Sequence, residues 1–296
     1  MLKGKFIQYL RHEKSHSSHT EIAYYNDLTQ FQEFIELECG HFDPAAIDSD
    51  LIRMWITHLV ENGISPKSAS RKLSAVKAFF KYLQKTGAVK KNPTEAIRGP
   101  KSHKKLPAFI NHKEISRVLD NQEYFSNDFQ GRRDQFIIEL LYLTGMRRAE
   151  LIGLKDSDID KDSKTLRVEG KRKKERLIPL SDNSYEKLEQ YIQIRNREIE
   201  NKSPFLFVKN NGDPIYPKMI YNIVNKHLEA ISTVAKKSPH TLRHSFATEM
   251  LNNGAEINAV KEILGHSSLA STEIYTHVTF EELKRVYQNA HPRANK

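Results

Sequence analysis

The chain has 296 residues, enough for two ordinary domains that each bury a core. Its 47 Lys and Arg residues exceed its 37 Asp and Glu residues, and the formal charge of +10 favours a polyanionic partner, nucleic acid before an anionic membrane surface. No apolar run approaches the ~20 residues that cross a bilayer, and the first residues lack a secretion signal, so we expect a cytoplasmic protein with no membrane partner.

Residues 1–98 carry only helical patterns, and their punctuation fits four or five helices. The run after Ser18 has apolar residues at helical spacing, which predicts one buried stripe made of Ile22, Tyr25, Leu28, Phe31 and Ile35. In the next segment, apolar pairs recur every four residues and include Trp55, which we expect in the core. Asn92 and Pro93 are expected to open a further short helix. This part of the chain is predicted to be a helical domain.

The helix expected between Pro66 and Gly87 has one apolar side and one basic side. Its candidate DNA-binding residues are Lys67, Arg71, Lys77, Lys81 and Lys85, and no acidic residue lies between Pro66 and Gly87. An ordinary solvated helix face is the alternative, but such a face normally intersperses both signs of charge. The pattern therefore favours contacts of these side chains with phosphate groups.

Residues 99–107 read GPKSHKKLP and show no hydrophobic periodicity, which is typical of a linker. We therefore predict a first domain over residues 1–98 and a second over residues 108–296. A basic linker between two basic domains favours a clamp around a duplex, with Lys104 and Lys105 near the DNA backbone.

The second domain mixes helices with a small β-sheet. Its helical patterns cover several stretches, which are residues 113–119, 132–144, 183–200 and those from 218 onward. Residues 165–168 and 175–178 read instead as two strands across a polar turn, with Lys171 at the tip. The chain as a whole is predicted to be mainly α with a small β-sheet.

Three strings in the second domain carry groups suited to phosphate chemistry. They are TGMRRAEL at residues 144–151, HTLRHSFAT at 240–248, and LGHSS with IYTH between 264 and 277. Together they resemble the catalytic signature of the tyrosine recombinase family, and of Xer-like recombinases in particular. The segment SPKSASRKLSAVKAFFKYL also resembles the family's core-DNA-binding domain. The resemblance implies a helical, SAM-like core-DNA-binding domain followed by a mixed α/β catalytic domain.

Arg147 and Arg243 are the candidate phosphate ligands. Cleavage of a phosphodiester builds negative charge on two non-bridging oxygens, and a guanidinium group matches that geometry with paired donors that stay charged. A buried arginine is also often a plain salt-bridge partner, and Glu150, three residues after Arg147, fits that reading. In the family the residue that matches Glu150 supports the site, so both readings hold together.

Tyr275 is the candidate nucleophile because of its place in the third string. A free phenol has a pKa of ~10 and needs a base to take its proton during attack. The resemblance implies that His240 is this acid/base, that His266 hydrogen-bonds the phosphate, and that His244 supports its helix. For any one of the 13 histidines, a surface or core position is the alternative.

Lys171 matches the lysine that, in the family, gives a proton to the leaving 5′ oxygen. Arg172 stands where the family commonly has glycine, and plain phosphate contact is the alternative for the basic residues of this turn. No GxxxxGK[ST] loop is present, the run Asp156 to Asp160 departs from a calcium loop, and His240 lacks the glutamate of a zinc motif. We therefore expect no cofactor, no ATP and no metal.

The resemblance also implies how the protein would act on DNA. Four protomers, of this chain alone or with a related recombinase, would bind double-stranded DNA at inverted-repeat core sites. They would exchange strands through 3′-phosphotyrosyl bonds and a Holliday junction, in chromosome or plasmid dimer resolution or in integration and excision of a mobile element. The terminal helix would dock on a neighbouring subunit, with packing in cis as the alternative.

Three other functions stay open at this point. A topoisomerase-like enzyme would nick and rejoin DNA as a monomer, and assembly separates it from a recombinase. A regulator that binds DNA without catalysis would keep the fold, although the candidate catalytic residues argue against it. A metal-dependent nuclease would be sensitive to chelators.

Overall fold

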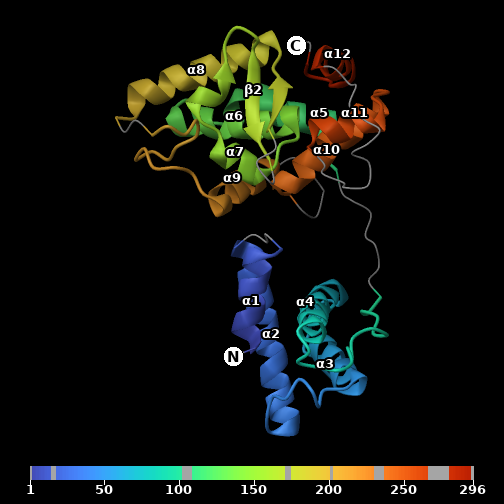
Figure 1. The fold of residues 1–296 in the computed structure, drawn as a ribbon. Coiled ribbons are helices and arrows are strands. Elements are labelled where there is room, and N and C mark those ends of the chain that lie inside the picture. Colours follow the sequence, from blue (N-terminus) through green and yellow to red (C-terminus); the bar gives the residue numbers. More distant parts are fainter. Residues whose placement is uncertain are drawn as a thin grey trace. The chain divides into compact units, whose positions relative to one another are not determined.

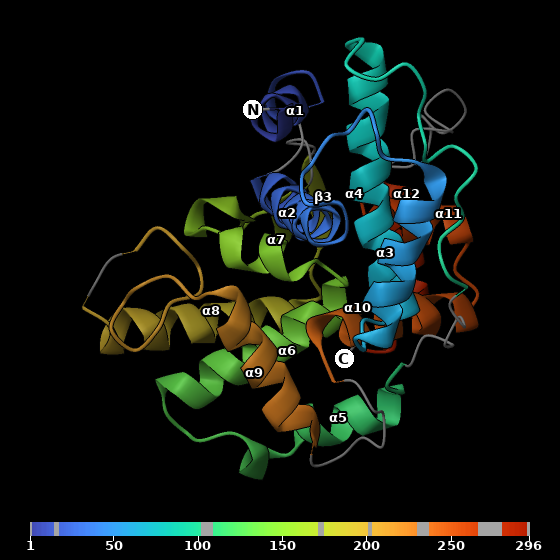
Figure 2. The same ribbon diagram turned by 90° about the horizontal axis from the view of Figure 1, so that it is seen from below.

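A computed structural model of the chain describes residues 2–14, 18–101, 109–170, 175–200, 203–229, 237–265 and 280–294. It divides into two compact units, Met1–Lys105 and Leu106–Lys296, each with its own hydrophobic core. The first unit consists of helices, and the second combines helices with one small sheet (Figures 1 and 2). Within these described ranges, no helix has the length and apolar character needed to cross a membrane.

The described part of the first unit is a bundle of four helices. They are α1 (Leu2–His12), α2 (Ser18–Cys39), α3 (Ser49–Glu61) and α4 (Pro66–Lys85). Helix α4 packs against each of the other three. Its start is fixed by Ser65, whose hydroxyl accepts a hydrogen bond from the backbone N–H of Ser68 at 3.2 Å, and by Pro66 in the first turn.

The core of the first unit is rich in aromatic side chains. Trp55 is 1% exposed and meets the ring of Phe31 edge-on, with 4.9 Å between the ring centroids. Phe31 also contacts Phe80 of α4. The predicted core position of Trp55 is confirmed.

The predicted apolar stripe on α2 is buried from Leu28 onward but exposed before it. Ile22 and Tyr25 are 59% and 46% exposed, so their predicted burial is wrong. The buried face at this end of α2 instead carries Glu21, which forms an ion pair with Arg11 of α1 at 2.7 Å. Because Arg11 pairs with Glu21, the charged Glu21 is buried and its apolar neighbour Ile22 is exposed.

The short helix predicted after Asn92 is a turn. The Asn92 side chain accepts hydrogen bonds from the backbone N–H of Thr94 at 3.0 Å and from the Thr94 hydroxyl at 2.7 Å. An asparagine side chain that bonds the backbone two residues further on competes with the hydrogen bonds of a helix. After the turn, Ile97 enters the core of the first unit.

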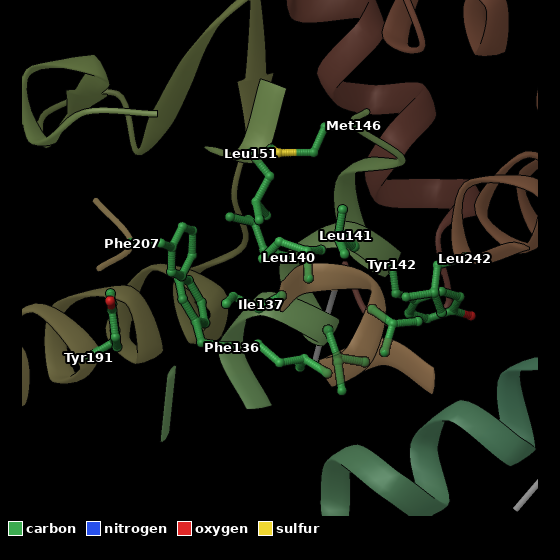
Figure 3. Packing of buried hydrophobic residues seen from close by; sticks show 14 of the residues in the cluster. Phe136, Ile137, Leu140, Leu141, Tyr142, Met146, Leu151, Tyr191, Phe207 and Leu242 are labelled. Atoms are coloured by element: carbon green, nitrogen blue, oxygen red, sulfur yellow. The ribbon is translucent and has the colours of Figure 1, made fainter. Parts of the chain in front are cut away.

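The second unit is organised around helix α6 (Phe129–Thr144), which is buried along most of its length. Its partners are α5 (His112–Asp120), α8 (Asp182–Glu198), α9 (Pro217–Glu229) and α10 (Pro239–Asn252). Figure 3 shows side chains from this core, among them Phe136, Leu140, Tyr142, Tyr191, Phe207 and Leu242. Gly145, left-handed with a φ of 58°, ends α6 and leads into α7 (Arg148–Gly153).

The described strands of the second unit form an antiparallel sheet. Their order is β1 (Ile159–Asp160), β2 (Thr165–Glu169) and β3 (Glu175–Pro179), with the 3-10 turns η1 (Gln122–Tyr124) and η2 (Asp156–Asp158) before it. The two predicted strands are confirmed as β2 and β3, whereas β1 is not predicted from the sequence. In their register Val168 lies opposite Arg176. Lys171 and Arg172, expected at the tip of this hairpin, lie outside the described residues.

A second hydrophobic cluster joins the C-terminal helices. Helices α11 (Ile257–Ile263) and α12 (Phe280–Ala290) pack on α10, and α12 also contacts β3. Tyr287 of α12 is 1% exposed beside Phe246 and Ile263. After α12, the buried guanidinium group of Arg293 reaches Asp120 of α5 at 2.8 Å. In this single chain the terminal helix therefore packs on its own unit.

Candidate active site

Arg147 stands at the N-terminus of α7, where the sequence turns from the left-handed Gly145 into a new helix. Its backbone N–H donates to one carboxylate oxygen of Glu150 at 2.8 Å, and its Nη1 donates to the other at 2.7 Å. Its Nη2 donates to the backbone carbonyl of Gly265 at 3.0 Å. The side chain is still 34% exposed, so Arg147 is held in place and remains accessible.

Glu150 is the buried carboxylate of the site. Besides Arg147, it accepts a hydrogen bond from Nη2 of Arg176 on β3 at 2.8 Å. Burial alone would raise the pKa of Glu150, but the hydrogen bonds from Arg176 and Arg147 outweigh burial and lower it below its ordinary value. Glu150 is therefore ionised at neutral pH and fixes two arginines.

Arg243 lies on α10 and is almost completely buried. Its Nη1 donates to the carbonyl of Gly145 and its Nη2 to the carbonyl of Leu264, both at 2.7 Å. Burial first, and then the neighbouring Arg147, lower the pKa of Arg243 to about 10, so the group is charged at neutral pH but in an unfavourable place for a cation. A side chain at position 145 would clash, because its Cβ would lie 2.5 Å from the ring of Phe246.

Three arginines from distant parts of the chain meet at the end of α11. The carbonyls of Ile263, Leu264 and Gly265 are three in succession, at the C-terminus of a helix, where the last carbonyls lack intrahelical partners. Arg176 donates to the carbonyl of Ile263 at 2.8 Å, Arg243 to that of Leu264 at 2.7 Å, and Arg147 to that of Gly265 at 3.0 Å. The predicted pair of arginines is therefore brought together directly before residue 266.

The candidate histidines divide between described and undescribed residues. His240 is exposed on the first turn of α10, which begins at the N-cap Ser238 and Pro239, and it precedes Arg243 by about one turn of helix. His244 is also exposed. His266 and Tyr275, like Lys171, Arg172, Lys104 and Lys105, lie outside the described residues.

The five basic residues predicted to contact DNA from α4 differ in their surroundings. Arg71 forms an ion pair with the buried Asp27, Lys77 donates to the carbonyl of Ile97 at 2.6 Å, and Lys85 pairs with Glu13 at the surface. These contacts give Arg71 and Lys77 structural roles within the first unit. In the described part of the chain, the exposed Lys67 and Lys81 form no ion pair or hydrogen bond and stay the better candidates for phosphate contact.

Arg176 is a residue of the site that was not predicted from the sequence. In a strand, side chains two apart share a face, so Arg176 lies on the same side as the buried Ile178. A basic residue at an inward-facing position of a predicted strand is the sequence feature that could have identified Arg176. The sequence instead predicts Lys171 and Arg172 of the neighbouring turn.

The aspartates that resemble the start of a calcium loop have protein partners. Asp156 accepts two hydrogen bonds from Arg195, at 2.8 and 2.7 Å, and Asp158 pairs with Arg167 at 3.2 Å. Among the residues that the structure describes, no group of three or more His, Cys, Asp or Glu side chains is placed to hold a metal ion. The expectation that the protein uses no cofactor stays a prediction.

Comparison with known families gives the class of the protein. The phage integrase family matches residues 108–282, and the N-terminal SAM-like domain of phage integrases matches residues 4–87. The chain is 37% identical to tyrosine recombinase XerC of Chlorobaculum tepidum, over 98% of this chain and 94% of that protein. It is 35% identical to XerC of Bacillus subtilis, over 98% and 96%. The chain therefore belongs to the phage integrase family, within its Xer-like tyrosine recombinases, which are enzymes that cleave and rejoin DNA strands.

Solved structures have the same fold. The Tn1549 transposon integrase in complex with transposon right end DNA superposes with a TM-score of 0.74 at 22% identity, covering 96% of this chain and 97% of that one. XerH bound to its difH substrate gives 0.70 at 22% identity, over 96% and 83%. A λ integrase tetramer bound to a Holliday junction gives 0.72 at 17% identity, over 91% and 77%.

Proposed function

We propose that the chain is a site-specific DNA recombinase that uses Tyr275 as its nucleophile. The Tyr275 hydroxyl attacks the phosphorus of one phosphodiester, forms a 3′-phosphotyrosyl bond and releases the 5′ oxygen as a hydroxyl. A 5′ hydroxyl of the partner strand then attacks this bond and frees the tyrosine, so each ester bond broken is replaced by another and no ATP is needed. The observation that carries the proposal is the convergence of Arg147 and Arg243 on two successive carbonyls, next to residue 266.

Arg147 and Arg243 hold the two non-bridging oxygens of the phosphate in this scheme. A guanidinium group has five N–H donors, so each arginine keeps donors beyond those it uses within the protein. Three guanidinium groups surround one carboxylate, that of Glu150, which leaves an excess of positive charge. An anionic phosphate relieves this excess, and the negative charge that develops during cleavage is stabilised most.

The remaining steps are proton transfers. At pH 7 only about one phenol in a thousand is ionised, a deficit of ~4 kcal/mol that the site must offset. His240 takes the proton of Tyr275, and its exposed position about one turn before Arg243 supports this role. His266 hydrogen-bonds the phosphate, and Lys171 gives a proton to the leaving 5′ oxygen, with Arg172 as a phosphate contact. Glu150 and His244 support the site.

Solved relatives support a DNA substrate and a multimeric assembly. XerH is described with its difH site and λ integrase as a tetramer on a Holliday junction. We propose that four protomers, alike or with a related recombinase, bind inverted-repeat core sites in the cytoplasm. Residues 1–98 form the core-binding domain, 99–107 the linker and 108–296 the catalytic domain. The outcome is dimer resolution or the integration and excision of a mobile element.

A covalent trap tests the proposal and finds the DNA site at the same time. The full chain is incubated with a library of duplexes that have randomised arms and a nick beside the cleavage position, so that the cut end is lost and the adduct persists. Duplexes that stay attached to protein in SDS are sequenced, and the best of them is called the selected duplex below. We expect attachment through Tyr275, shown by peptide mass.

The Tyr275→Phe variant is the matched control. It lacks only the attacking oxygen, so we expect it to bind the selected duplex with affinity close to that of the unaltered chain and to form no adduct. Normal adducts in this variant would refute the assignment. Mixing two labelled duplexes then separates strand exchange from simple nicking and rejoining by a monomer, because only exchange yields products that carry both labels.

A further inference from the structure

We infer that Arg176 is a positioning residue for cleavage: it ties the Glu150–Arg147 pair to the end of α11 and so fixes the spacing of the phosphate-binding arginines. This inference rests on the proposed function. Arg176 is on β3, outside the three strings that resemble the catalytic signature, and it does not need to touch the DNA.

The geometry shows one guanidinium group bridging two elements. Nη2 of Arg176 donates to Glu150 at 2.8 Å, and its Nε donates to the carbonyl of Ile263 at 2.8 Å. The side chain is 13% exposed, so both contacts are shielded from water. Since Glu150 also holds Arg147, one chain of contacts runs from the start of α7, through β3, to the end of α11.

Arg243 and Arg147 bind the next two carbonyls, and their positions therefore depend on the same helix end. If the end of α11 moved, both arginines would have to follow it or lose a hydrogen bond. Arg176 is the contact that joins this helix end to the buried carboxylate. A displacement of reacting groups by about 1 Å can slow a reaction by ~100-fold. The two contacts of Arg176 are therefore expected to affect the rate of cleavage.

The turn at Gly265 lies close against Arg176. Gly265 has a φ of 64°, and a Cβ added there would lie 3.2 Å from Nη1 of Arg176. The planar fork of arginine can hold a carboxylate and a carbonyl at once from two of its nitrogens, whereas lysine has a single nitrogen. The site therefore requires an arginine at position 176, and a positive charge alone does not replace it.

Removal of Arg176 has a consequence for pH dependence. The charged groups that interact with Glu150 are Arg147 at the start of α7, Arg176 on β3 and Arg243 on α10. Charged residues of the neighbouring strands line a pocket together with Glu150, and they are Arg167, Glu169 and Glu175. Burial raises the pKa of Glu150, and hydrogen bonding to Arg176 is the largest effect that lowers it. Without Arg176 the pKa of Glu150 rises, so Glu150 becomes protonated, and releases Arg147, at a higher pH than in the unaltered chain.

The test compares Arg176→Gln and Arg176→Lys with Arg167→Gln as a matched control. Arg167 lies on the adjacent strand β2, is about half exposed and pairs only with Asp158 among the described residues. The rate of adduct formation on the selected duplex is measured from pH 5 to 9 for each full-length variant. Affinity for the same duplex is measured with Tyr275→Phe added, so that no cleavage occurs, and thermal unfolding reports on the fold.

We expect Arg176→Gln to slow adduct formation by about 100-fold, with duplex affinity within about threefold of the unaltered chain. Its rate should also fall more steeply toward pH 5 than that of the unaltered chain, because Glu150 is protonated at a higher pH. The rate of Arg176→Lys should fall less steeply toward pH 5 than that of Arg176→Gln, because the charge remains, while still being lower than that of the unaltered chain. Arg167→Gln should change neither quantity.

Two results would overturn the inference. One is a rate for Arg176→Gln equal to that of Arg167→Gln. The other is a reduced rate that is matched by an equal loss of duplex affinity, which would make Arg176 an ordinary structural arginine. Failure of the proposed function looks different: the unaltered chain would then give no adduct that depends on Tyr275, whatever residue stands at position 176.

Discussion

Each unit of the molecule contains a cluster of basic residues around one buried carboxylate, and the two clusters differ in how the positive charge is balanced. In the first unit Asp27, 2% exposed, accepts hydrogen bonds from Arg71 at 2.8 Å and Lys72 at 3.0 Å. The Arg71 side chain is 50% exposed, so water solvates the cation that the carboxylate does not neutralise. This cluster ties α2 to α4, and because solvent offsets its excess positive charge we call it the balanced cluster.

The cluster of the second unit is unbalanced. Glu150 is surrounded by Arg147, Arg176 and Arg243. These arginines donate to successive carbonyls at and just after the end of α11, whereas the first cluster is solvated by water. Carbonyl dipoles satisfy hydrogen bonds but do not cancel charge. The number of arginines therefore does not mark a site for an anion, whereas buried positive charge without enough carboxylate does.

The largest effect should come from Arg243→Gln, which removes the most deeply buried cation of the unbalanced cluster. We expect adduct formation on the selected duplex to fall by about 1,000-fold, equivalent to ~4 kcal/mol of transition-state stabilisation. The free energy of unfolding should change by only ~1 kcal/mol, because relief of repulsion from Arg147 offsets part of the lost hydrogen bonds. Rates come from gel assays of the adduct, and unfolding from urea titration.

A matched change in the balanced cluster should have the opposite profile. Asp27→Asn leaves Arg71 and the buried Lys72 without their counter-charge, and we expect it to lower the free energy of unfolding by about 3 kcal/mol. Once folded, the variant should form adducts at nearly the normal rate. If Asp27→Asn slowed cleavage as much as Arg243→Gln, both clusters would be catalytic and the comparison would fail.

Some parts of the fold depend on local contacts and others on distant partners, and only the former follow from the sequence. Helix starts such as Ser65 with Pro66, and Ser238 with Pro239, are fixed by local hydrogen bonds and by proline, so their positions follow from a few adjacent residues. The exposure of Ile22 does not follow, because it depends on an ion pair between two helices. Local signals therefore predict where elements begin, and distant partners decide which face is buried.

The candidate site is predictable to a similar extent. Arg147 and Arg243 occur in strings with recognisable spacing, and the structure brings them together at α11. Arg176 was missed because its role depends on a carboxylate and a carbonyl that are distant in sequence. The structural use of Arg71 was missed for the same reason, since Asp27 lies on another helix.

The second unit also buries a histidine, His291, which should make its stability depend on pH. His291 is 3% exposed, accepts a hydrogen bond from the backbone N–H of Arg293 at 3.2 Å, and its Nε2 has no partner among the described residues. Burial, above all, lowers the pKa of His291 to about 3 from the ordinary 6.5. Below pH 6.5 His291 binds a proton in the unfolded chain but stays neutral in the folded chain. The free energy of unfolding therefore falls as the pH decreases toward 3.

Between pH 6.5 and pH 5 this effect amounts to about 2 kcal/mol. We expect His291→Phe, which keeps a ring beside Tyr287, to remove most of this acid-induced loss, as measured by urea unfolding at both pH values. The buried His227, whose pKa is also lowered by burial, should leave a smaller residual slope. The exposed His41, changed to Gln, serves as the control and should leave the loss intact; an equal loss in His291→Phe would contradict the assignment.

The smallest expected effect is on the salt dependence of DNA binding by the two lysines of α4, Lys67 and Lys81. Lys67 and Lys81 are exposed and form no ion pair within the described residues, so replacing both with Gln should leave stability unchanged to within ~0.5 kcal/mol. If both contact phosphates, the slope of log affinity against log salt for the selected duplex should become shallower by roughly 0.9 per contact. The measurement uses fluorescence anisotropy in the Tyr275→Phe background. The exposed Lys113 of α5, changed to Gln, is the control for a general charge effect, and an equal change in slope there would remove Lys67 and Lys81 from the interface.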